Sequence, residues 1–449
     1  MTAYTFNAMD RSIISIISQS MKVDLKLSDT QLGLLGGTAF AMLYAAGGIP
    51  IARLAERFNR VNIISVTLVI WSALSAMCGV AATFPQLLMA RAGVGIAESG
   101  CSPPAHSLIS DYFEPSRRTS ALSIYSCGLS LGYILAAVCG SYIVQHWGWR
   151  AACVSVGLPG IGVALLIKLL IREPPRSGES MPPLSIRSEA RELGAVAKAL
   201  WSDTPIRHMI LGITLGGFAA YGFYAFVHPY FRRAYDLDYT TVGVIVGFAG
   251  GVAVGAGIIA GGFLADALAR QSGRWYALVP GIGGIIALPL FGLSLLQADW
   301  RTAAALLSLA GFFQYVSLGP TFGVVQNVIE QRRRATATAL LYIALSVLAL
   351  GGGPLFTGWM TDRFAQAEFS RTMPPAVQTG ADARFADACP GGVGAATAGA
   401  ELRAACTGSL IRGTRRGLMM TLLFFGWAAV HYLLAANGIA KSLRAASAR

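Results

Sequence analysis

The chain has 449 residues, of which 54% are hydrophobic and only 13% are charged. Soluble domains carry about 25% charged residues, so this composition excludes a soluble globular protein and predicts an integral membrane protein. The net charge of +13 does not indicate nucleic-acid binding, because the basic residues lie in short loops between apolar segments, where they face anionic lipid.

Apolar segments long enough to cross a bilayer recur along the whole chain. One crossing needs about 20 mostly apolar residues. Six such segments precede a polar stretch rich in proline and charge, and six follow it, near 2–20, 31–55, 62–82, 86–110, 119–145, 151–171, 206–230, 241–267, 275–296, 302–328, 336–361 and 416–439. The sequence therefore predicts an all-α membrane protein with an N-terminal six-helix bundle (1–171), a linker (172–204) and a C-terminal six-helix bundle (205–445).

The distribution of Lys and Arg over the loops predicts the orientation. If the N-terminus lies in the cytoplasm, seventeen Lys and Arg residues fall on the cytoplasmic side and six in the short loops of the other side. Cytoplasmic loops carry the excess of positive charge. We therefore expect a multi-pass protein of the inner (cytoplasmic) membrane, with both termini and the linker in the cytoplasm and the segment of about 363–415 outside.

The first and fourth predicted spans contain four charged residues: Asp10, Arg11, Arg91 and Glu98. A charge at the centre of a membrane helix costs about 2.5–3.5 kcal/mol, so such residues usually pair with each other or face a water-filled path. Arg91 and Glu98 are seven residues apart and share a helix face, with Gly95 between them to admit a neighbouring helix, for which we expect the first span. Asp10 and Arg11 project about 100° apart and cannot face one point. We expect Asp10 to pair with Arg91, which leaves Glu98 to face a cavity together with Arg11.

The two halves of the chain carry matching loop residues. Glu56 lies in the run ARLAER after the second span, and Asp266 ends the run GGFLAD after the eighth. Arg117 precedes Tyr125 by eight residues at the start of the fifth span. Arg334 precedes Tyr342 by the same eight residues at the start of the eleventh. Matching loops in two six-span halves indicate an internally repeated transporter with its binding site near the bilayer midplane.

Several motifs resemble those of the major facilitator superfamily over essentially the whole chain. The loop after the second span reads ARLAERFNR (residues 52–60), where the superfamily has Gly-x-x-x-Asp-Arg-x-x-Arg, with Ala52 and Glu56 replacing Gly and Asp. The fourth span with its exit (91–113) and the pair Trp149-Arg150 also match. The resemblance implies two pseudo-symmetric six-helix bundles around a central cavity, transport by alternating access and a monomer.

Within the superfamily, the chain resembles the spinster-like transporters. The similarity lies in Asp10-Arg11, in Phe58-Asn59-Arg60 and in Glu98-Ser99. Eukaryotic members of that family are associated with sphingosine-1-phosphate and lysophospholipids, so the resemblance implies an amphipathic anionic lipid as substrate. Such transporters have a longer apolar stretch before the Asp-Arg pair, whereas nine residues precede Asp10 here, and we expect the native first helix to begin upstream.

We expect proton coupling through Asp10 and Glu98, with the proton gradient as driving force and no cofactor. Burial favours the neutral form of a carboxyl group, and a nearby arginine favours the ionised form. Arg11 and Arg91 would act as switches whose contacts change between conformations, or would hold an anionic headgroup. The alternative is that these residues form static structural pairs.

Aromatic residues of the seventh and tenth spans are candidates for the substrate cavity. A C-terminal half rich in aromatic residues, facing a charged N-terminal half, suits a substrate with a polar head and an acyl chain. Aromatic residues at helical spacing more often pack than bind, so packing is the alternative. The candidates are Tyr221, Phe223, Tyr224, Phe226, Phe313, Gln314 and Tyr315.

A second group of residues is predicted at the cytoplasmic ends of the helices. The resemblance implies that it latches neighbouring helices in the outward-open state through ion pairs and charges at helix ends. We expect a conformational gate and not a binding site. Its members are Glu56, Arg57, Arg60, Asp111, Arg118 and Asp266.

The remaining features concern the external segment and other function classes. Cys389 and Cys406 lie in an oxidising compartment, so a disulfide between them is one alternative and a loosely ordered loop the other. The sequence has no phosphate-binding Gly-x-x-x-x-Gly-Lys-Ser/Thr loop and no metal-ligand spacing, so it does not favour an enzyme. Besides lipid transport, the alternatives are a transporter of small organic anions or drug-like compounds and a non-transporting membrane receptor.

Overall fold

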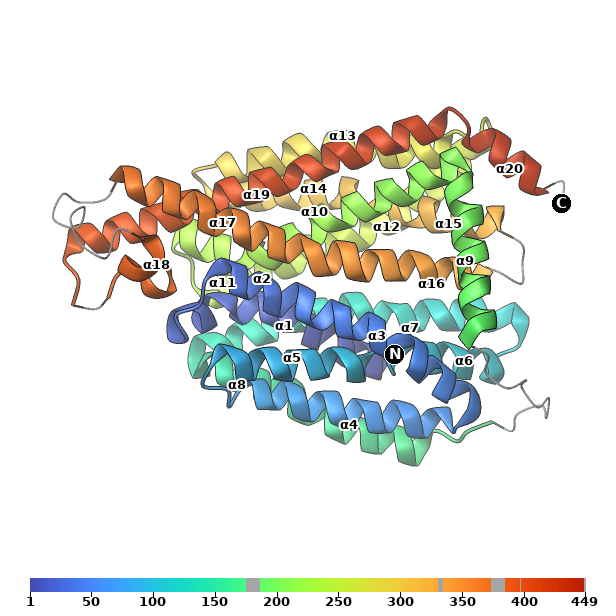
Figure 1. Ribbon diagram of the computed structural model, residues 1–449, viewed down its shortest axis with the longest axis horizontal. Coiled ribbons are helices and arrows are strands. Elements are labelled where there is room, and N and C mark those ends of the chain that lie inside the picture. Colours follow the sequence, from blue (N-terminus) through green and yellow to red (C-terminus); the bar gives the residue numbers. More distant parts are fainter. Residues whose placement is uncertain (175–185, 330–333, 373–383, 396, 448–449) are drawn as a thin grey trace. The chain divides into compact units, whose positions relative to one another are not determined.

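The computed structural model describes residues 1–174, 186–329, 334–372, 384–395 and 397–447, apart from some side chains that include those of Glu56 and Arg118. The regular structure of this part of the chain is helical throughout (Figure 1). Each of the twelve predicted spans falls on helical residues, which confirms the predicted all-α membrane fold. Eight helical stretches of the described part are long and apolar enough to cross a membrane by themselves.

The predicted spans of the first half correspond to single helices or to consecutive helical elements. These elements are α1 (Thr2–Asp24), α2 (Asp29–Gly33), η1 (Leu34–Thr38), α3 (Ala39–Arg57), α4 (Arg60–Cys78), α5 (Phe84–Glu98), α6 (Ser102–Tyr112), α7 (Pro115–Leu135), η2 (Ala136–Gly140) and α8 (Ser141–Leu170).

The rest of the described chain comprises the helix of the predicted linker and the second half, which repeats this organisation. Its elements are α9 (Ile186–Ser202), α10 (Thr204–Tyr235), α11 (Tyr239–Gly247), η3 (Phe248–Ala253), α12 (Val254–Ala269), α13 (Trp275–Leu296), α14 (Trp300–Tyr315), α15 (Leu318–Val328), α16 (Arg334–Ala344), η5 (Leu345–Leu350), α17 (Gly351–Thr372), α18 (Phe385–Ala388), η7 (Pro390–Gly392), α19 (Ala400–Ala436) and α20 (Ile439–Ser447).

Four of the elements, η1, η2, η3 and η5, are π-helical turns inside long helices. They lie in the second, fifth, eighth and eleventh predicted spans. A π turn holds one more residue than an α turn, and such turns are frequent at functional sites. In the sequence, η3 and η5 follow η1 and η2 at nearly the same interval, which supports the internal repeat inferred from the loops.

Local sequence signals explain where several helices begin and bend. The Ser28 hydroxyl accepts a hydrogen bond from the Gln31 backbone N–H and the Gln31 side chain bonds back, which forms a capping box at the start of α2. Asn59 and Asp238 cap α4 and α11 in the same way with one side-chain bond each. Gly148 has φ of 80° inside α8, in the gap between the fifth and sixth predicted spans. A glycine is required there because this conformation is costly for other residues.

The chain forms two compact units. Unit 1 comprises residues 1–174, 221–251 and 350–421, and unit 2 comprises residues 175–220, 252–349 and 422–449. Segments from both halves of the sequence therefore pack together in unit 1. The division into two sequence-contiguous bundles, 1–171 and 205–445, stays a prediction.

Unit 1 brings helices of the two sequence halves into direct contact at one end. We call this the outer end; it contains the end of α1, the start of α2 and the segment from α18 to η7, all predicted to face outside. A Cβ on Gly33 of α2 would lie 2.3 Å from the Pro354 carbonyl oxygen of α17, and one on Gly358 would lie 2.1 Å from the Asp29 carbonyl oxygen. The two helices approach this closely because both contact positions are glycine.

Each unit has its own apolar core. In unit 1, Phe40, Trp71 and Val94 of α3, α4 and α5 are at most 1% exposed. In unit 2, Val196 of α9 packs with Met209 of α10. The predicted linker therefore contains a helix whose apolar face is part of a core.

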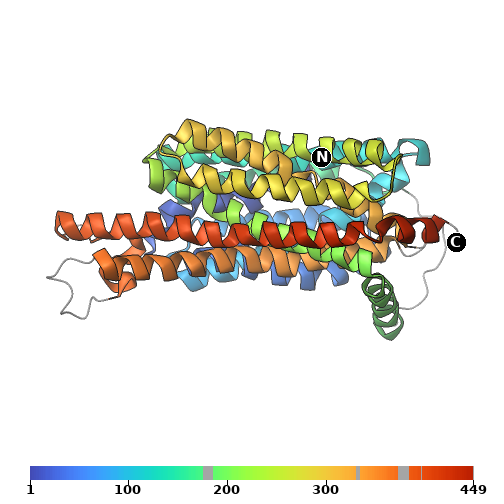
Figure 2. The same ribbon diagram turned by 90° about the horizontal axis from the view of Figure 1, so that it is seen from above.

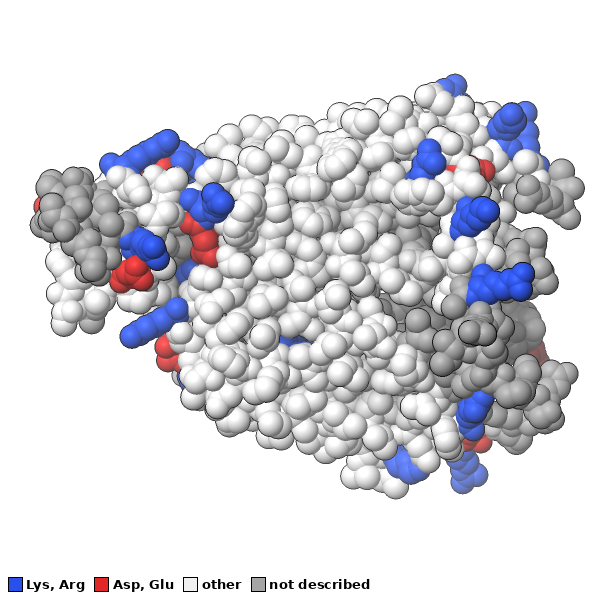
Figure 3. Space-filling view, in the orientation of Figure 1, with Lys and Arg blue, Asp and Glu red and all other residues white. Residues whose placement is uncertain are grey.

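The outer surfaces of the helices are apolar, as a protein in lipid requires. Large hydrophobic side chains such as Phe263 of α12 and Leu165 of α8 are well exposed. Figure 3 shows charged side chains gathered near the ends of helices, whereas the sides of the helices in view are almost free of charge. Figure 2 shows α19 as one uninterrupted helix. Its 37 residues span about 55 Å, more than the hydrocarbon core of about 30 Å, so its N-terminal part extends beyond the bilayer.

Candidate substrate and proton site

The site is built from the four charged residues of the first and fourth predicted spans, and all its contacts lie inside unit 1. Arg91 Nη1 of α5 lies 2.8 Å from Asp10 Oδ2 of α1, with both side chains buried. The Ser75 hydroxyl of α4 donates a hydrogen bond to the other oxygen, Oδ1. Both oxygens of Asp10 thus have a donor.

The second pair joins Arg11 to Glu98. Arg11 Nε lies 2.8 Å from Glu98 Oε2, and Asn7 Nδ2 donates to the same oxygen at 2.9 Å. Glu98 is 0% exposed, and its Oε1 accepts no hydrogen bond from the described residues. The two carboxylates, both buried, therefore differ in how completely their oxygens are paired.

Two aromatic rings of α3 lie against the guanidinium groups. The Cζ atom of Arg11 is 5.0 Å from the centre of the Phe40 ring and 4.5 Å from that of Tyr44, and Arg91 Cζ is 5.4 Å from the Phe40 ring. Phe40 and Tyr44 are one helical turn apart and lie on one face of α3. A cation is attracted to such a ring face, more strongly when both are desolvated. The rings thus stabilise both cations, and more strongly Arg91, whose side chain is buried.

The helix geometry explains why two pairs form. Asp10 and Arg11 are adjacent and diverge, whereas Arg91 and Glu98 lie two turns apart, about 10 Å along α5. The expected contact between Asp10 and Arg91 is present. Glu98 does not face an open cavity together with Arg11. It is sealed in the protein and paired with Arg11, whose side chain is 30% exposed, because Asn7 and Arg11 are one turn apart on α1 and both reach Glu98.

Gly95 admits a different helix from the expected one. A Cβ at this position would lie 2.5 Å from the Phe40 carbonyl oxygen, so the close neighbour is α3 and not α1. The expectation was wrong because a small residue indicates a close approach without identifying the partner. The contact instead brings the ring of Phe40 against both arginines.

We expect Gly95→Ala to destabilise the protein by about 1–3 kcal/mol, because its methyl group would meet backbone that cannot rotate away. Gly162→Ala in α8 is the matched control: nothing lies within 4 Å of its added Cβ, and replacing a helical glycine is expected to stabilise by up to about 1 kcal/mol. The thermal unfolding midpoint of both variants in the same detergent measures the difference. Equal midpoints would contradict the tight α3–α5 contact.

The aromatic candidates of α10 fall into two groups. Tyr221 is 43% exposed, whereas Phe223 and Phe226 are at most 1% exposed and pack inside the protein in this conformation. The Tyr224 carbonyl oxygen accepts a hydrogen bond from the Ser15 hydroxyl of α1. Only Tyr221 of this set is well exposed.

The candidates of the tenth span lie in unit 2, at the end of α14. Phe313 packs edge-on against Phe312 with ring centres 5.3 Å apart. Gln314 is buried, and its Oε1 accepts no hydrogen bond from the described residues. Tyr315 is partly buried.

The predicted gate residues have partners on their own units. Arg60 is bonded to Asp111 at 2.5 Å and to Glu173 at 2.7 Å, and it also donates to the Ser107 hydroxyl at 2.8 Å. In unit 2, Asp266 accepts a hydrogen bond from the Tyr276 hydroxyl at 2.9 Å.

The rest of the predicted gate is exposed or not described. Arg57 is exposed, and the side chains of Glu56 and Arg118 lie outside the described part of the chain. Glu173, which follows the sixth span, is a partner that the sequence analysis did not single out.

Comparisons with known proteins agree with this architecture. The family model of the Major Facilitator Superfamily matches residues 1–354. The chain belongs to the major facilitator superfamily.

Three of the proteins that this superfamily member resembles are transporters or homologs of transporters. A crystal structure of a bacterial homolog to the human lysosomal transporter spinster, in an inward-facing and unoccupied conformation, is 31% identical and superposes with a TM-score of 0.85 over 98% of this chain and 96% of that chain. An MFS-type efflux pump of Mycolicibacterium smegmatis is 27% identical over 80% of this chain and 82% of its own length. A probable L-galactonate transporter of Escherichia coli is 23% identical over 80% of this chain and 81% of its own. This superfamily member is thus a multi-pass membrane transporter related to spinster.

Proposed function

We propose that the chain is a proton-coupled secondary transporter that moves an amphipathic anionic lipid, such as a lysophospholipid or a sphingosine-1-phosphate-like molecule, by alternating access. The observation that carries the proposal is the unequal pairing of Asp10 and Glu98. We further propose that it works as a monomer in the cytoplasmic membrane, with both termini in the cytoplasm.

Glu98 is the better proton acceptor of the two carboxylates. Asp10 has a donor on each oxygen, one of them a charged arginine. Both donors to Glu98 are on Oε2, which leaves Oε1 buried without one. An unpaired carboxylate oxygen away from water is costly, and a proton on that oxygen removes the cost. Glu98 therefore carries the proton, and Asp10 with Arg91 forms a second ion pair whose contact changes during the transport cycle.

Arg11 couples the proton to the substrate. Its side chain is 30% exposed, whereas its partner Glu98 is fully buried, so an incoming anion reaches the guanidinium but not the carboxylate. A guanidinium group binds phosphate and carboxylate well. When a headgroup draws Arg11 away, Glu98 loses its counter-charge in a buried place and takes up a proton.

The surroundings of Arg11 favour a substrate with an apolar part. Tyr44 and Phe40 lie against the guanidinium, and Tyr221 of the same unit is well exposed. The similarity to a spinster homolog points the same way. The second candidate is a small organic anion, which is favoured by the similarity to the probable L-galactonate transporter.

We also propose that Arg60, Asp111 and Glu173 hold α4, α6 and the end of the sixth span together at the cytoplasmic face. Their ion pairs are within 2.7 Å, and Arg60 is 3% exposed. Glu56, Arg57, Arg118 and Asp266 stay predicted gate residues.

Flux into proteoliposomes tests the proposal. We expect labelled lysophospholipid to enter vesicles that contain the protein, and to accumulate faster when a pH gradient is imposed. A gradient collapsed with a proton ionophore is the control. Galactonate flux in place of lysolipid flux would support the second candidate, and lysolipid flux that ignores the gradient would contradict proton coupling.

A further inference from the structure

A second group of buried charges lies at the outer end of unit 1, away from the proposed proton site. Asp29 at the start of α2 is bonded to Lys22 of α1 at 2.7 Å and to Arg233 of α10 at 2.8 Å. The three side chains are at most 3% exposed. Burial alone would raise the pKa of the Asp29 carboxyl, but the charges of Arg233 and Lys22 hold this pKa below its usual range. Asp29 is therefore ionised at neutral pH.

Asp362 of α17 supplies the second negative charge. Its carboxylate accepts hydrogen bonds from the backbone N–H groups of Asp29 at 3.0 Å and Thr30 at 2.7 Å, and from the Thr30 hydroxyl at 2.6 Å. The free N–H groups of a helix start attract an anion. Asp362 thus caps α2 from a helix that belongs to the other half of the sequence.

Arg233 also forms hydrogen bonds with α1 and α19. Its Nε donates to Gln19 Oε1 of α1 at 2.6 Å, and its Nη1 donates to the Thr414 hydroxyl of α19 at 2.8 Å. We call Lys22, Asp29, Arg233 and Asp362 the outer charge network. It holds two basic and two acidic residues, and its members come from both halves of the sequence.

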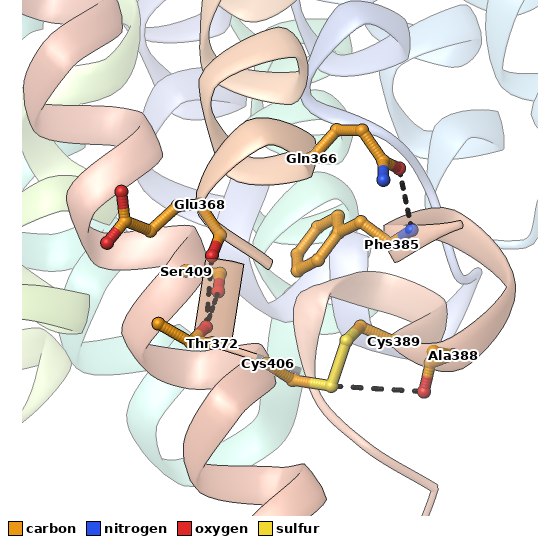
Figure 4. Close-up of a disulfide and its surroundings, with 8 residues drawn as sticks. All are labelled: Gln366, Glu368, Thr372, Phe385, Ala388, Cys389, Cys406 and Ser409. Atoms are coloured by element: carbon orange, nitrogen blue, oxygen red, sulfur yellow. Dashed lines mark hydrogen bonds between the residues drawn. A yellow bond between two sulfur atoms is a disulfide. The ribbon is translucent and has the colours of Figure 1, made fainter. Parts of the chain in front are cut away.

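A segment held by the disulfide packs against Lys22 of this network. The disulfide joins Cys389 and Cys406, which is the first of the two alternatives for these cysteines (Figure 4). Figure 4 shows the Gln366 side chain beside Phe385, whose backbone N–H donates to Gln366 Oε1 at 2.7 Å. We call residues 385–392 the cover segment.

The cover segment reaches Lys22 through two glycines. A Cβ on Gly391 would lie 2.9 Å from the Lys22 carbonyl oxygen, and one on Gly392 would lie 2.9 Å from Lys22 Cε. Both glycines have positive φ, 69° and 81°. Larger residues would meet both strain and the lysine, so the segment fits closely over the lysine only with glycine here.

A transporter of this superfamily must open each side in turn, so the helices of the two sequence halves have to separate at the outer end. A contact that has to open is easier to separate when it consists of buried ion pairs than when it is apolar. Burying charges is costly compared with burying apolar side chains, and the charges regain water when the contact opens. The closed and open states are therefore nearer in free energy than they would be with an apolar contact.

We propose that the outer charge network, sealed by the disulfide-held cover segment, is the latch that keeps the outer end closed. The inference rests on the transport cycle of the superfamily and not on the lipid substrate or on proton coupling.

The distance between spin labels at Val80 of the loop after α4 and Ala367 of α17 reports opening. Both positions are exposed and belong to different sequence halves, and the exposed Cys127 and Cys139 are first replaced by serine. The two labelled cysteines are introduced at positions 80 and 367, and the protein is measured in lipid nanodiscs. We expect Asp29→Asn to raise the ratio of open to closed populations at least about tenfold, since it leaves Lys22 and Arg233 opposite a single carboxylate.

Asp24→Asn is the matched control. Asp24 lies at the same end and pairs with Arg150, and the two side chains are 45% and 44% exposed. An exposed pair contributes little, so this variant should keep the wild-type distances. Unchanged distances in Asp29→Asn, or an equal change in both variants, would overturn the latch. Lys22→Met/Asp29→Asn removes one charge of each sign but still takes the ion-pair partner from Arg233, so it should open less than Asp29→Asn. If the single variant does not fold, wild-type distances in this double variant would overturn the latch.

The role of the cover segment is tested with Cys389→Ser/Cys406→Ser in the same labelled background. We expect an increase in the open population that is smaller than that of Asp29→Asn, because the ion network itself is intact. Ser409→Ala, which alters a buried hydroxyl beside the same segment but keeps the disulfide, is the control. An unchanged population in the serine variant would remove the cover segment from the latch.

Discussion

Glu98→Gln is expected to abolish lysolipid accumulation driven by a pH gradient, a loss of at least about a hundredfold, while exchange of labelled for unlabelled substrate continues. Glutamine keeps the size of the side chain and the acceptor for Asn7 and Arg11, but it cannot take up a proton on the buried oxygen. Exchange needs no net proton movement, so it survives. The measurement is the initial rate of both reactions in the same proteoliposomes at equal protein content.

Two controls separate proton coupling from a simple loss of fold. Glu401→Gln changes an exposed glutamate at the start of α19 and should leave both rates unchanged. Asn7→Ala removes one donor from Glu98 but keeps the carboxyl group. We expect this variant to retain coupling and to shift its pH profile towards more alkaline values, because the ionised form loses a hydrogen bond. Gradient-driven accumulation by Glu98→Gln at the wild-type rate would end the assignment of Glu98 as proton carrier.

Asp10→Asn is expected to lower the free energy of unfolding by about 3–5 kcal/mol, since it leaves Arg91 buried without a counter-charge. The cost is high at this position because Arg91 Nε already lacks a hydrogen-bond partner among the described residues. Asp24→Asn breaks an exposed pair and should cost less than about 1 kcal/mol. Thermal unfolding midpoints of the two variants give the comparison.

A double variant distinguishes a functional pair from a static one. Asp10→Leu/Arg91→Met replaces the buried pair by apolar side chains of similar size, and such replacements often restore stability. We expect its unfolding midpoint to return towards that of the wild type while gradient-driven transport stays below about a tenth. A stable double variant with normal transport would establish the pair as purely structural.

The sequence could identify the charged members of the site but not most of their neutral partners. Asp10, Arg11, Arg91 and Glu98 stand out because charges are rare in apolar spans. Asn7 and Ser75 do not stand out, since single amide and hydroxyl groups are common in membrane helices. Asn7 precedes Arg11 by one helical turn, and this spacing is the one signal that could have linked it to the site.

Contacts between helices far apart in the sequence could not be predicted either, for a related reason. In the sequence, Lys22 and Arg233 lie in short loops predicted on the outer side, where their charge bears only on orientation. Their burial with Asp29 and Asp362 depends on which helices meet in unit 1, and no local pattern encodes that choice. Similarly, Gly95 indicates a close neighbour, but only the fold shows that it is α3.

The four π-helical turns have a consequence for the origin of the protein. Each adds one residue to a helix, and they occupy the second, fifth, eighth and eleventh spans, which is the middle helix of every three-helix unit. Superfamily halves are built from two such units in inverted orientation. A π turn in the middle helix of every unit is the pattern expected of a chain built by duplication of three-helix units.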